Sequence, residues 1–326
     1  MVRASGFQPD DLGSIPSRRI KNKMEQHINQ ADHISHETKK HWYDRWYKTL
    51  LFIPVTLLIF SLIYLSSFYS QNNDFIYKDS SLSGGTTITL RAELDIVALE
   101  NHIKQSVENV NIRTISDIST GKQIAVLIDS SAEPDVLKPL VESFIGYELT
   151  TENSSIEFSG PSLGANFYKQ LIIAVIISFV LMSLVIFFLF KTFIPSIAVI
   201  FAAFSNIIMT LAVVDFFGIR LSAAGIAAFL MLIGYSVDTD ILLTSRVLRR
   251  RGESINSRIS GAFKTGIFMT STGLLAVIPA FLIVTGLPES FRQIFLILGI
   301  GLSADIINTW LTNASIIKWY AEYKKL

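Results

Sequence analysis

Three aspartates interrupt long apolar stretches in the second half of the chain: Asp238, Asp240 and Asp305. A carboxylate inside a membrane-spanning helix costs at least about 2.5 kcal/mol to insert, so such a residue is a functional candidate by default. Carboxyl groups within membranes commonly bind and release protons. We therefore begin with these residues and ask which elements would bring them together.

Helix geometry places polar side chains from three different spans at one depth. At a rise of 1.5 Å per residue, Asp238 lies roughly 26 Å and Asp305 roughly 21 Å from the outer ends of their spans. Thr270, Ser271 and Thr272 lie roughly 10–14 Å from the inner end of another span. The sequence thus predicts a proton-binding polar cluster on the cytoplasmic side of the membrane midplane. Its members are Asp238, Asp240, Asp305, Asn308, Thr270 and Ser271.

Asp238 and Asp240 cannot share one site, because residues two apart on a helix point about 200° away from each other. We expect Asp238 to face the core, since Gly234 lies one turn before it and allows close helix contact. The segment Gly234-Tyr235-Ser236 is thus predicted to be a helix-packing motif. For Asp240, a functional role and an ion pair with Arg246 at the membrane boundary are equally open.

Six apolar runs are long enough to cross the roughly 30 Å hydrocarbon core as helices. The first is 50–69 and the second is 171–190; four more begin near residues 192, 221, 265 and 291, and the last ends near 317. The mean hydropathy of +0.44 agrees with a membrane protein. The predicted fold is an α-helical membrane protein whose helices 2–6 occupy residues 166–317.

Lys and Arg near the span ends predict the orientation. Basic residues precede the first span, follow the fourth and follow the sixth, in three segments that alternate correctly to share one side. Both termini are therefore expected in the cytoplasm, in a multi-pass protein of the cell membrane.

The two tails, 1–49 and 318–326, are predicted to be cytoplasmic. Residues 1–23 lack apolar periodicity, which favours disorder. Met24 is as plausible a start as Met1. Four histidines in this tail (His27, His33, His36 and His41) could suggest a metal site, but no spacing repeats, and a solvated tail is favoured.

Residues 70–165 separate the first two spans and are long enough to fold as an extracytoplasmic domain. Strand and helix patterns alternate as β-α-β-β-α-β, with strands near 86–92, 110–116, 122–129 and 147–158. This is the order of an α+β ferredoxin-like sandwich. Gly84 and Gly85, where the chain enters the domain, predict a tight backbone approach, and no GxxxxGK[ST] phosphate loop follows them.

The composition excludes several functions. The chain has no cysteine, and 28 Lys and Arg against 27 Asp and Glu leave a net charge of +1. Disulfides and thiolate metal sites are ruled out, and nothing favours nucleic-acid binding. We predict no enzyme activity, cofactor or metal.

The stretch LIGYSVDTDILLTSRVLRRRGE (232–253) closely resembles the fourth transmembrane segment of the SecF family, within the resistance-nodulation-division superfamily. The bacterial pattern of the family is G-Y-S-[IV]-N-D-T, and the D-T-D-I-L-L form here resembles the archaeal branch. FSGPSLGANF (158–167) is similar to the family's segment before span two. Two departures stand out. Ser81 occupies the Asp position of the family's D-x-x-G-G motif, although Asp79 is near, and Lys264 is only a shifted substitute for the Arg that the bacterial family places at the start of span five.

The resemblance implies an auxiliary subunit of the Sec export machinery. Its partners would be a SecD-like subunit, the Sec translocon channel, an unfolded secretory protein and the membrane lipid, and its energy source the proton gradient. One alternative is half of a small-molecule or lipid exporter of the same superfamily, although such chains carry twelve spans and two outer domains. Another is an intramembrane aspartyl protease, but the usual GxGD context precedes neither Asp238 nor Asp305.

Overall fold

A computed structural model describes residues 42–107, 110–117, 120–249, 252–283 and 289–326. The chain forms two compact units, 1–46 and 47–326, and the fold described below is that of the second. Most of the N-terminal tail, including its four histidines and the predicted disorder at 1–23, lies outside the described residues.

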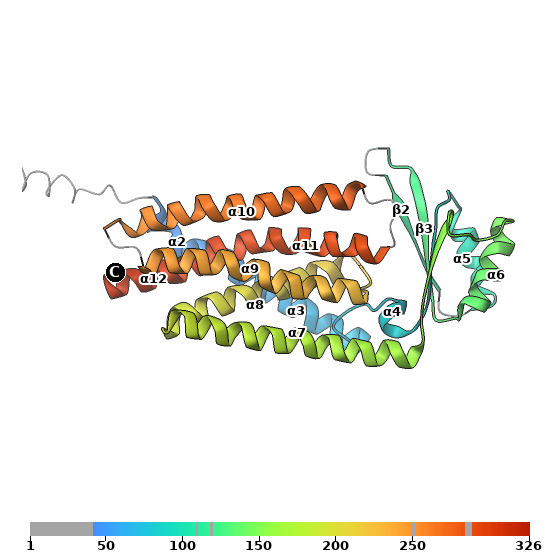
Figure 1. The fold of residues 1–326 in the computed structure, drawn as a ribbon, viewed down its shortest axis with the longest axis horizontal. Helices are drawn as coiled ribbons and strands as arrows, with labels where there is room; N and C mark the ends of the chain where they lie inside the picture. The colour runs from blue at the N-terminus through green and yellow to red at the C-terminus, as the bar shows by residue number, and fades with distance from the viewer. Residues whose placement is uncertain (1–41, 108–109, 118–119, 250–251, 284–288) are drawn as a thin grey trace, which may run out of the picture. The chain divides into compact units, whose positions relative to one another are not determined.

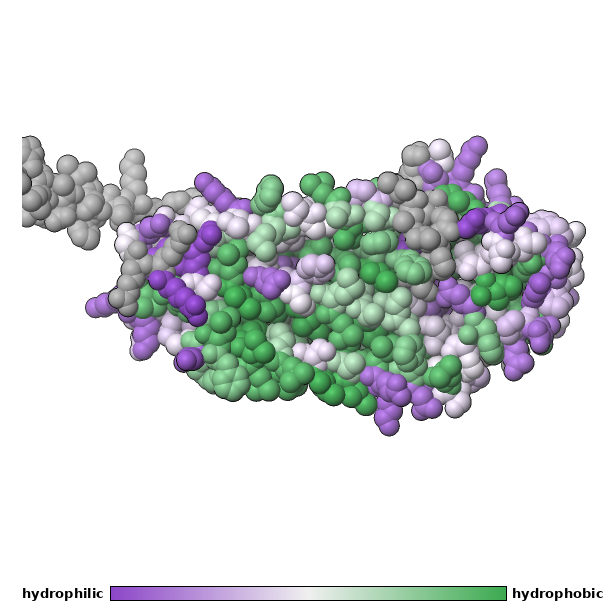
Figure 2. Space-filling view, viewed as in Figure 1, coloured by the Kyte–Doolittle hydropathy of each residue, from purple (hydrophilic) through white to green (hydrophobic). Residues whose placement is uncertain are grey.

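Six helical segments are long and apolar enough to cross a membrane, as the sequence predicts. The first span comprises α2 (Trp42–Leu50) and α3 (Phe52–Asn72), and the next four are α7 (Pro161–Phe190), α8 (Phe193–Phe216), α9 (Ala223–Arg249) and α10 (Ile255–Ile283). The sixth consists of α11 (Glu289–Ile307), the π-helix η1 (Asn308–Asn313) and α12 (Ala314–Lys324). On the face that Figure 2 shows, apolar side chains cover most of this bundle, and most of the polar ones gather at its two ends. Helices are the expected form here, because lipid offers the backbone no hydrogen-bond partners.

A four-stranded antiparallel sheet lies at one end of the helices (Figure 1). The short helix α4 (Ser80–Ser83) leads into β1 (Gly85–Leu90), and α5 (Ile96–Lys104), β2 (Val110–Ser116), β3 (Gln123–Ser130), α6 (Pro134–Ile145) and β4 (Ser154–Ser159) follow. The order of strands and helices agrees with the predicted one, and the strands lie side by side as β2-β3-β1-β4. Ile88 is paired with Ile128 on one side and Ile156 on the other.

The two faces of the sheet differ because side chains alternate along a strand. Ile88 and Ile128 point to the face that α5 and α6 cover, where they pack with Leu99 and Val141. On the opposite face Thr87 is paired in register with Asp129, and that face is polar. In Figure 1 the polar face looks toward the ends of the helices, so the fold brings polar strand residues to the loops between spans.

Span four lies at the centre of the helical bundle. α9 packs against α7, α8, α10 and α11. Its buried residues recur at helical spacing, as at Phe229, Ile233, Ser236, Asp240 and Leu243. This buried stripe decides which polar residues of the span reach the core.

Candidate functional site

Asp240 of α9 and Asp305 of α11 are both completely buried, at 0% and 1% exposure. The two helices approach closely because glycines line their contact: a Cβ at Gly301 would lie 2.4 Å from the Leu232 side chain. The structure thus joins spans four and six around two of the predicted carboxylates.

Hydroxyl groups surround the Asp305 carboxylate. Ser236 donates a short hydrogen bond to Oδ1, and the Thr239 hydroxyl donates to Oδ2 at 3.0 Å. Thr309, one turn further along span six, donates to Oδ1 at 3.4 Å. These hydroxyls supply the hydrogen bonds that a carboxylate buried away from water needs.

Asp240 has a different environment. Its Oδ1 accepts a hydrogen bond of 2.8 Å from the Asn313 amide, which also donates to Thr244 at 3.3 Å. Its Oδ2 is buried and has no hydrogen-bond partner among the described residues. One oxygen of Asp240 is therefore available for a proton or a water molecule.

The π-helix η1 supplies several of the polar side chains at this site. Asn308, Thr309, Thr312 and Asn313 are all buried within its six residues. Short π-helical segments often mark functional sites in long helices. Here the wider turn lets Thr309 and Asn313 face α9 while Asn308 faces α8, where its amide lies 3.4 Å from the Met209 sulfur.

The prediction that Asp238 faces the core is wrong. Asp238 is exposed, whereas Asp240 is buried. The helical period explains the difference. Asp240 comes seven residues after Ile233 and four after Ser236, so it lies on the buried stripe of α9, whereas Asp238 lies outside that stripe.

The predicted packing motif at 234–236 is likewise not a contact within this chain. A Cβ at Gly234 would meet no atom within 4 Å, and Tyr235 is 53% exposed. Ser236 is buried, but it binds Asp305 instead of providing a close helix approach. That approach comes from Gly301, and from Gly266 of α10, where a Cβ would lie 2.4 Å from Trp310.

The hydroxyls of α10 do not bind the carboxylates. Thr270 is buried and donates to Gly266 O of its own helix at 3.2 Å, and no hydrogen bond joins the half-buried Ser271 to either aspartate. Asn308 also turns away from them. The sequence prediction used only the depth of these residues in the membrane. The contacts also depend on where each side chain points, and the two carboxylates are bound by Ser236, Thr239, Thr309 and Asn313 instead.

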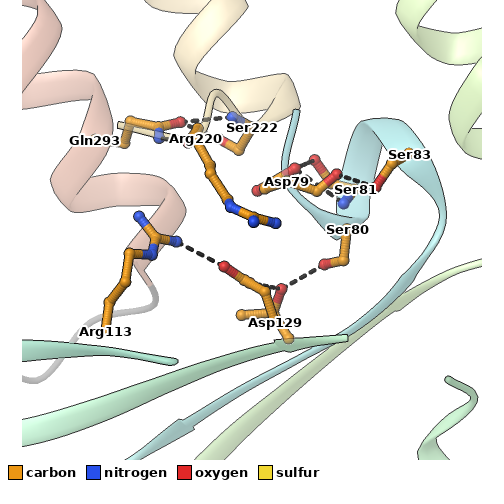
Figure 3. Close-up of polar contacts among 10 residues, drawn as sticks. Asp79, Ser80, Ser81, Ser83, Arg113, Asp129, Arg220, Ser222 and Gln293 are labelled. Carbon is orange, nitrogen blue, oxygen red and sulfur yellow. Dashed lines mark hydrogen bonds and ion pairs between the residues drawn. The ribbon is translucent and has the colours of Figure 1, made fainter. Parts of the chain in front are cut away.

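A second polar site connects the sheet domain to the helices (Figure 3). Leu221, between α8 and α9, pairs with the strand-like segment before α4: its N–H donates to Tyr77 O at 2.6 Å, and Asp79 N–H donates to Leu221 O at 3.0 Å. Asp79 and the neighbouring Arg220 are thereby brought together, and the Arg220 side chain points into the space between Asp79 and Asp129 (Figure 3).

Asp79 is the N-cap of α4. Its Oδ1 accepts from Ser81 N–H at 2.9 Å and from the Ser81 hydroxyl at 2.6 Å, and Ser81 in turn accepts from Ala223 N–H at 3.0 Å. Burial, with repulsion from Asp129 and Glu157, raises the pKa of Asp79 to about 7. The structure thus puts a carboxylate next to Ser81, the position where the family motif has Asp.

Gly84 and Gly85 make the tight approach that the sequence predicts. Gly84 has φ +84°, and a Cβ there would lie 2.3 Å from Pro161 Cα at the start of α7. At Gly85, with φ +129°, a Cβ would lie 2.1 Å from Ser130 O. Glycine is required at both positions because backbone occupies the space a side chain would need.

Contacts that the sequence does not reveal complete this junction. Gln293 of α11 accepts from Ser222 N–H at 2.8 Å and from its hydroxyl at 2.5 Å, and donates to Arg220 O. Arg113 of β2 forms an ion pair with Asp129 of β3 at 2.7 Å. Spans four and six, whose interiors hold the carboxylates, are thus also connected beside the sheet.

The family model "Protein export membrane protein SecD/SecF, C-terminal" matches residues 141–323. The protein-export membrane protein SecF of Methanolacinia petrolearia is 36% identical over 276 residues, covering 84% of this chain and 94% of the relative. SecF of Methanocaldococcus jannaschii is 35% identical over 286 residues, covering 85% and 97%.

Two solved structures share the fold. The crystal structure of SecDF, a translocon-associated membrane protein from Thermus thermophilus, matches with a TM-score of 0.68 at 16% identity, over 86% of this chain and 38% of that one. SecDF in a super-membrane-facing form matches with a TM-score of 0.55 at 18% identity, over 86% and 39%. This chain therefore spans about two fifths of the solved chains. On the strength of the curated relatives, the chain belongs to the SecF family of protein-export membrane proteins.

Proposed function

We propose that this chain is an auxiliary subunit of the Sec machinery that acts with a SecD-like partner and uses the proton gradient to assist export of unfolded proteins. The observation that carries this proposal is the pair of buried carboxylates between spans four and six. Asp305 is held by three hydroxyl donors, and Asp240 keeps one oxygen without a partner among the described residues. This asymmetry suits a relay in which the proton is taken up and released at the unpartnered oxygen of Asp240, beside Asp305.

The exposed face of α9 supports the need for a partner within the membrane. Asp238 lies on this face with Tyr235 and Gly234, and a cavity of about 400 Å³ beside it is lined by Asp238, Thr270 and Leu302. A carboxylate turned toward lipid at this depth would be costly, so a second polypeptide covers it in our proposal. Gly234 would allow a helix of the SecD-like subunit to come close.

We further propose that the sheet domain is an extracytoplasmic ferredoxin-like domain that meets the emerging chain, and that both termini are cytoplasmic. The element order, the strand order β2-β3-β1-β4 and the two helices on one face support the fold. The basic residues after α9 and α12 support the orientation, because cytoplasmic segments carry an excess of Lys and Arg.

Substitution of single carboxylates tests the proton relay. Asp240→Asn can still accept from Asn313 but can no longer titrate, so it should insert normally and abolish gradient-stimulated export. Asp305→Asn should do the same. The measurement is export of a secretory protein into vesicles that contain the channel and the partner, with and without a proton gradient.

Asp238→Asn is the matched control, since it lies on the same helix two residues away but outside the buried pair. We expect it to retain gradient stimulation, because asparagine keeps the size and polarity of the side chain that the second polypeptide covers. Full stimulation in both the Asp240 and the Asp305 variants would exclude a proton relay in this subunit.

A further inference from the structure

A lipid-accessible groove lies between the first two spans, in the half of the bundle nearest the sheet. α3 and α7 each pack against α8 but scarcely touch one another. The gap leaves a cavity of about 580 Å³, with Leu62 and Tyr69 of α3 on one wall and Ile172 and Val175 of α7 on the other. Ile207 of α8 and Phe229 of α9 form part of its floor.

The lining of the groove is almost wholly apolar. Twelve of its fifteen lining residues are aliphatic or phenylalanine, and the others are two tyrosines and Ser66. Its volume falls within the range typical of small-molecule sites. Both helices that form its walls belong to the three least buried spans, and their outward side chains, such as Ile63 and Ile173, are apolar. In a bilayer, hydrocarbon surrounds these helices and has direct access to the gap between them.

A polar cluster closes the end of the groove next to the sheet. Tyr168, which lines the groove, donates to Asp74 Oδ1 at 2.8 Å, and Lys78 binds the other oxygen of Asp74 at 2.7 Å. The Lys78 ammonium also lies 4.7 Å from the centre of the Tyr168 ring, and its side chain remains 32% exposed. Tyrosines are enriched at the interface with lipid headgroups, and lysines near helix ends extend their ammonium groups to it.

An apolar channel that ends at a partly exposed ammonium group, paired on one side with Asp74, matches the two parts of a phospholipid. We propose that this groove binds one phospholipid of the adjacent leaflet, with a hydrocarbon chain along α7 and the phosphate at Lys78. This site lies apart from the α9 face with Asp238, so it does not depend on the proposed function. The bound chain would fill the space between the first two spans and hold them apart.

Lipid retention by the purified full-length protein tests the proposal. The protein is incubated with phosphatidylglycerol in mild detergent, and retained lipid is measured by native mass spectrometry. Val175→Trp fills the groove and should abolish retention. Val180→Trp is the matched control, because it makes the same change on an exposed position of α7 outside the groove, and it should leave retention intact. Lys78→Gln should weaken retention. Equal retention in the two tryptophan variants would overturn the proposal.

A second measurement needs no substitution, so it does not depend on the variants folding. A phosphatidylglycerol with a diazirine near the end of its chain is photoactivated in vesicles that contain the unmodified protein. Crosslinks to the floor residues Ile207 and Leu211 are expected. Crosslinks confined to outward residues such as Ile173, or loss of the floor crosslinks once a SecD-like subunit is bound, would overturn it, and the latter would assign the groove to the partner.

Discussion

Asp79 is a titratable residue that joins the two parts of the fold. Its carboxylate caps α4, binds Ser81 and lies near Asp129 of the sheet, while Ser81 binds the start of α9. Ionisation of Asp79 therefore acts on the contact between the sheet domain and span four.

The pH dependence of stability should reveal this residue. The pKa of Asp79 is about 7 in the folded chain and about 3.9 in an unfolded one, so the folded state binds the proton more tightly. Stability should then fall as pH rises from about 4 to about 7. Asp79→Asn should flatten this slope in thermal unfolding followed in detergent.

Asp135→Asn provides the control, since Asp135 is exposed in the first turn of α6. It should leave the slope unchanged. Parallel pH profiles for the wild-type chain and Asp79→Asn would contradict the assignment.

At the scale of elements, the sequence predicts those helices and strands that hydropathy and the period of apolar residues determine. The spans follow from runs of apolar residues, and β2 begins and ends where its pattern does. The choice between Asp238 and Asp240 could also have been made from the period of buried residues in α9, but Gly234 suggested the wrong face. The partners of Asp240 could not be predicted, because η1 changes the direction of every side chain after Ile307.

The start of the sheet domain depends on one close backbone contact. Gly84→Ala should destabilise the chain by about 2–5 kcal/mol, since it adds an overlap with Pro161 to an unfavourable positive φ. Gly146→Ala separates the two effects: φ there is +79°, but no atom lies within 4 Å of the added Cβ, so about 1 kcal/mol is expected. Thermal unfolding of both variants measures the difference in stability. An equal loss of stability in the two variants would show that the overlap with Pro161 contributes nothing.

The helix α5 depends on its N-cap. Asp95 accepts from Val97 N–H and Ala98 N–H at 2.9 and 3.2 Å. Asp95→Ala should cost about 1 kcal/mol, whereas Asp95→Asn keeps an acceptor and should cost little. Denaturation by heat compares the two variants, and an alanine variant as stable as the asparagine variant would show that the cap contributes nothing.

For the whole molecule, the sequence predicts the number of spans and the order of strands and helices in the domain between the first two. It does not predict the junction, where Gln293, Arg220 and Asp79 come from segments far apart in the chain. No local pattern marks such contacts, because each residue alone resembles an ordinary surface residue.

Orientation can be tested in this cysteine-free chain. Thr151, between α6 and β4, and Ser254, between α9 and α10, are both exposed. Single cysteines at these positions should react with a membrane-impermeant maleimide from opposite sides, with Thr151→Cys accessible from outside intact cells. Labelling of both from one side would contradict the proposed topology.

The π-helix in span six sets the direction of the side chains that follow it. A π-turn holds one residue more than an α-turn, and moving that extra residue along the helix turns the residues it passes by about 100°. If the bulge moved beyond Asn313, that amide would swing away from Asp240 and leave the carboxyl without its donor. Gain or loss of a proton at Asp240 would then be coupled to a rotation of α12 about its own axis.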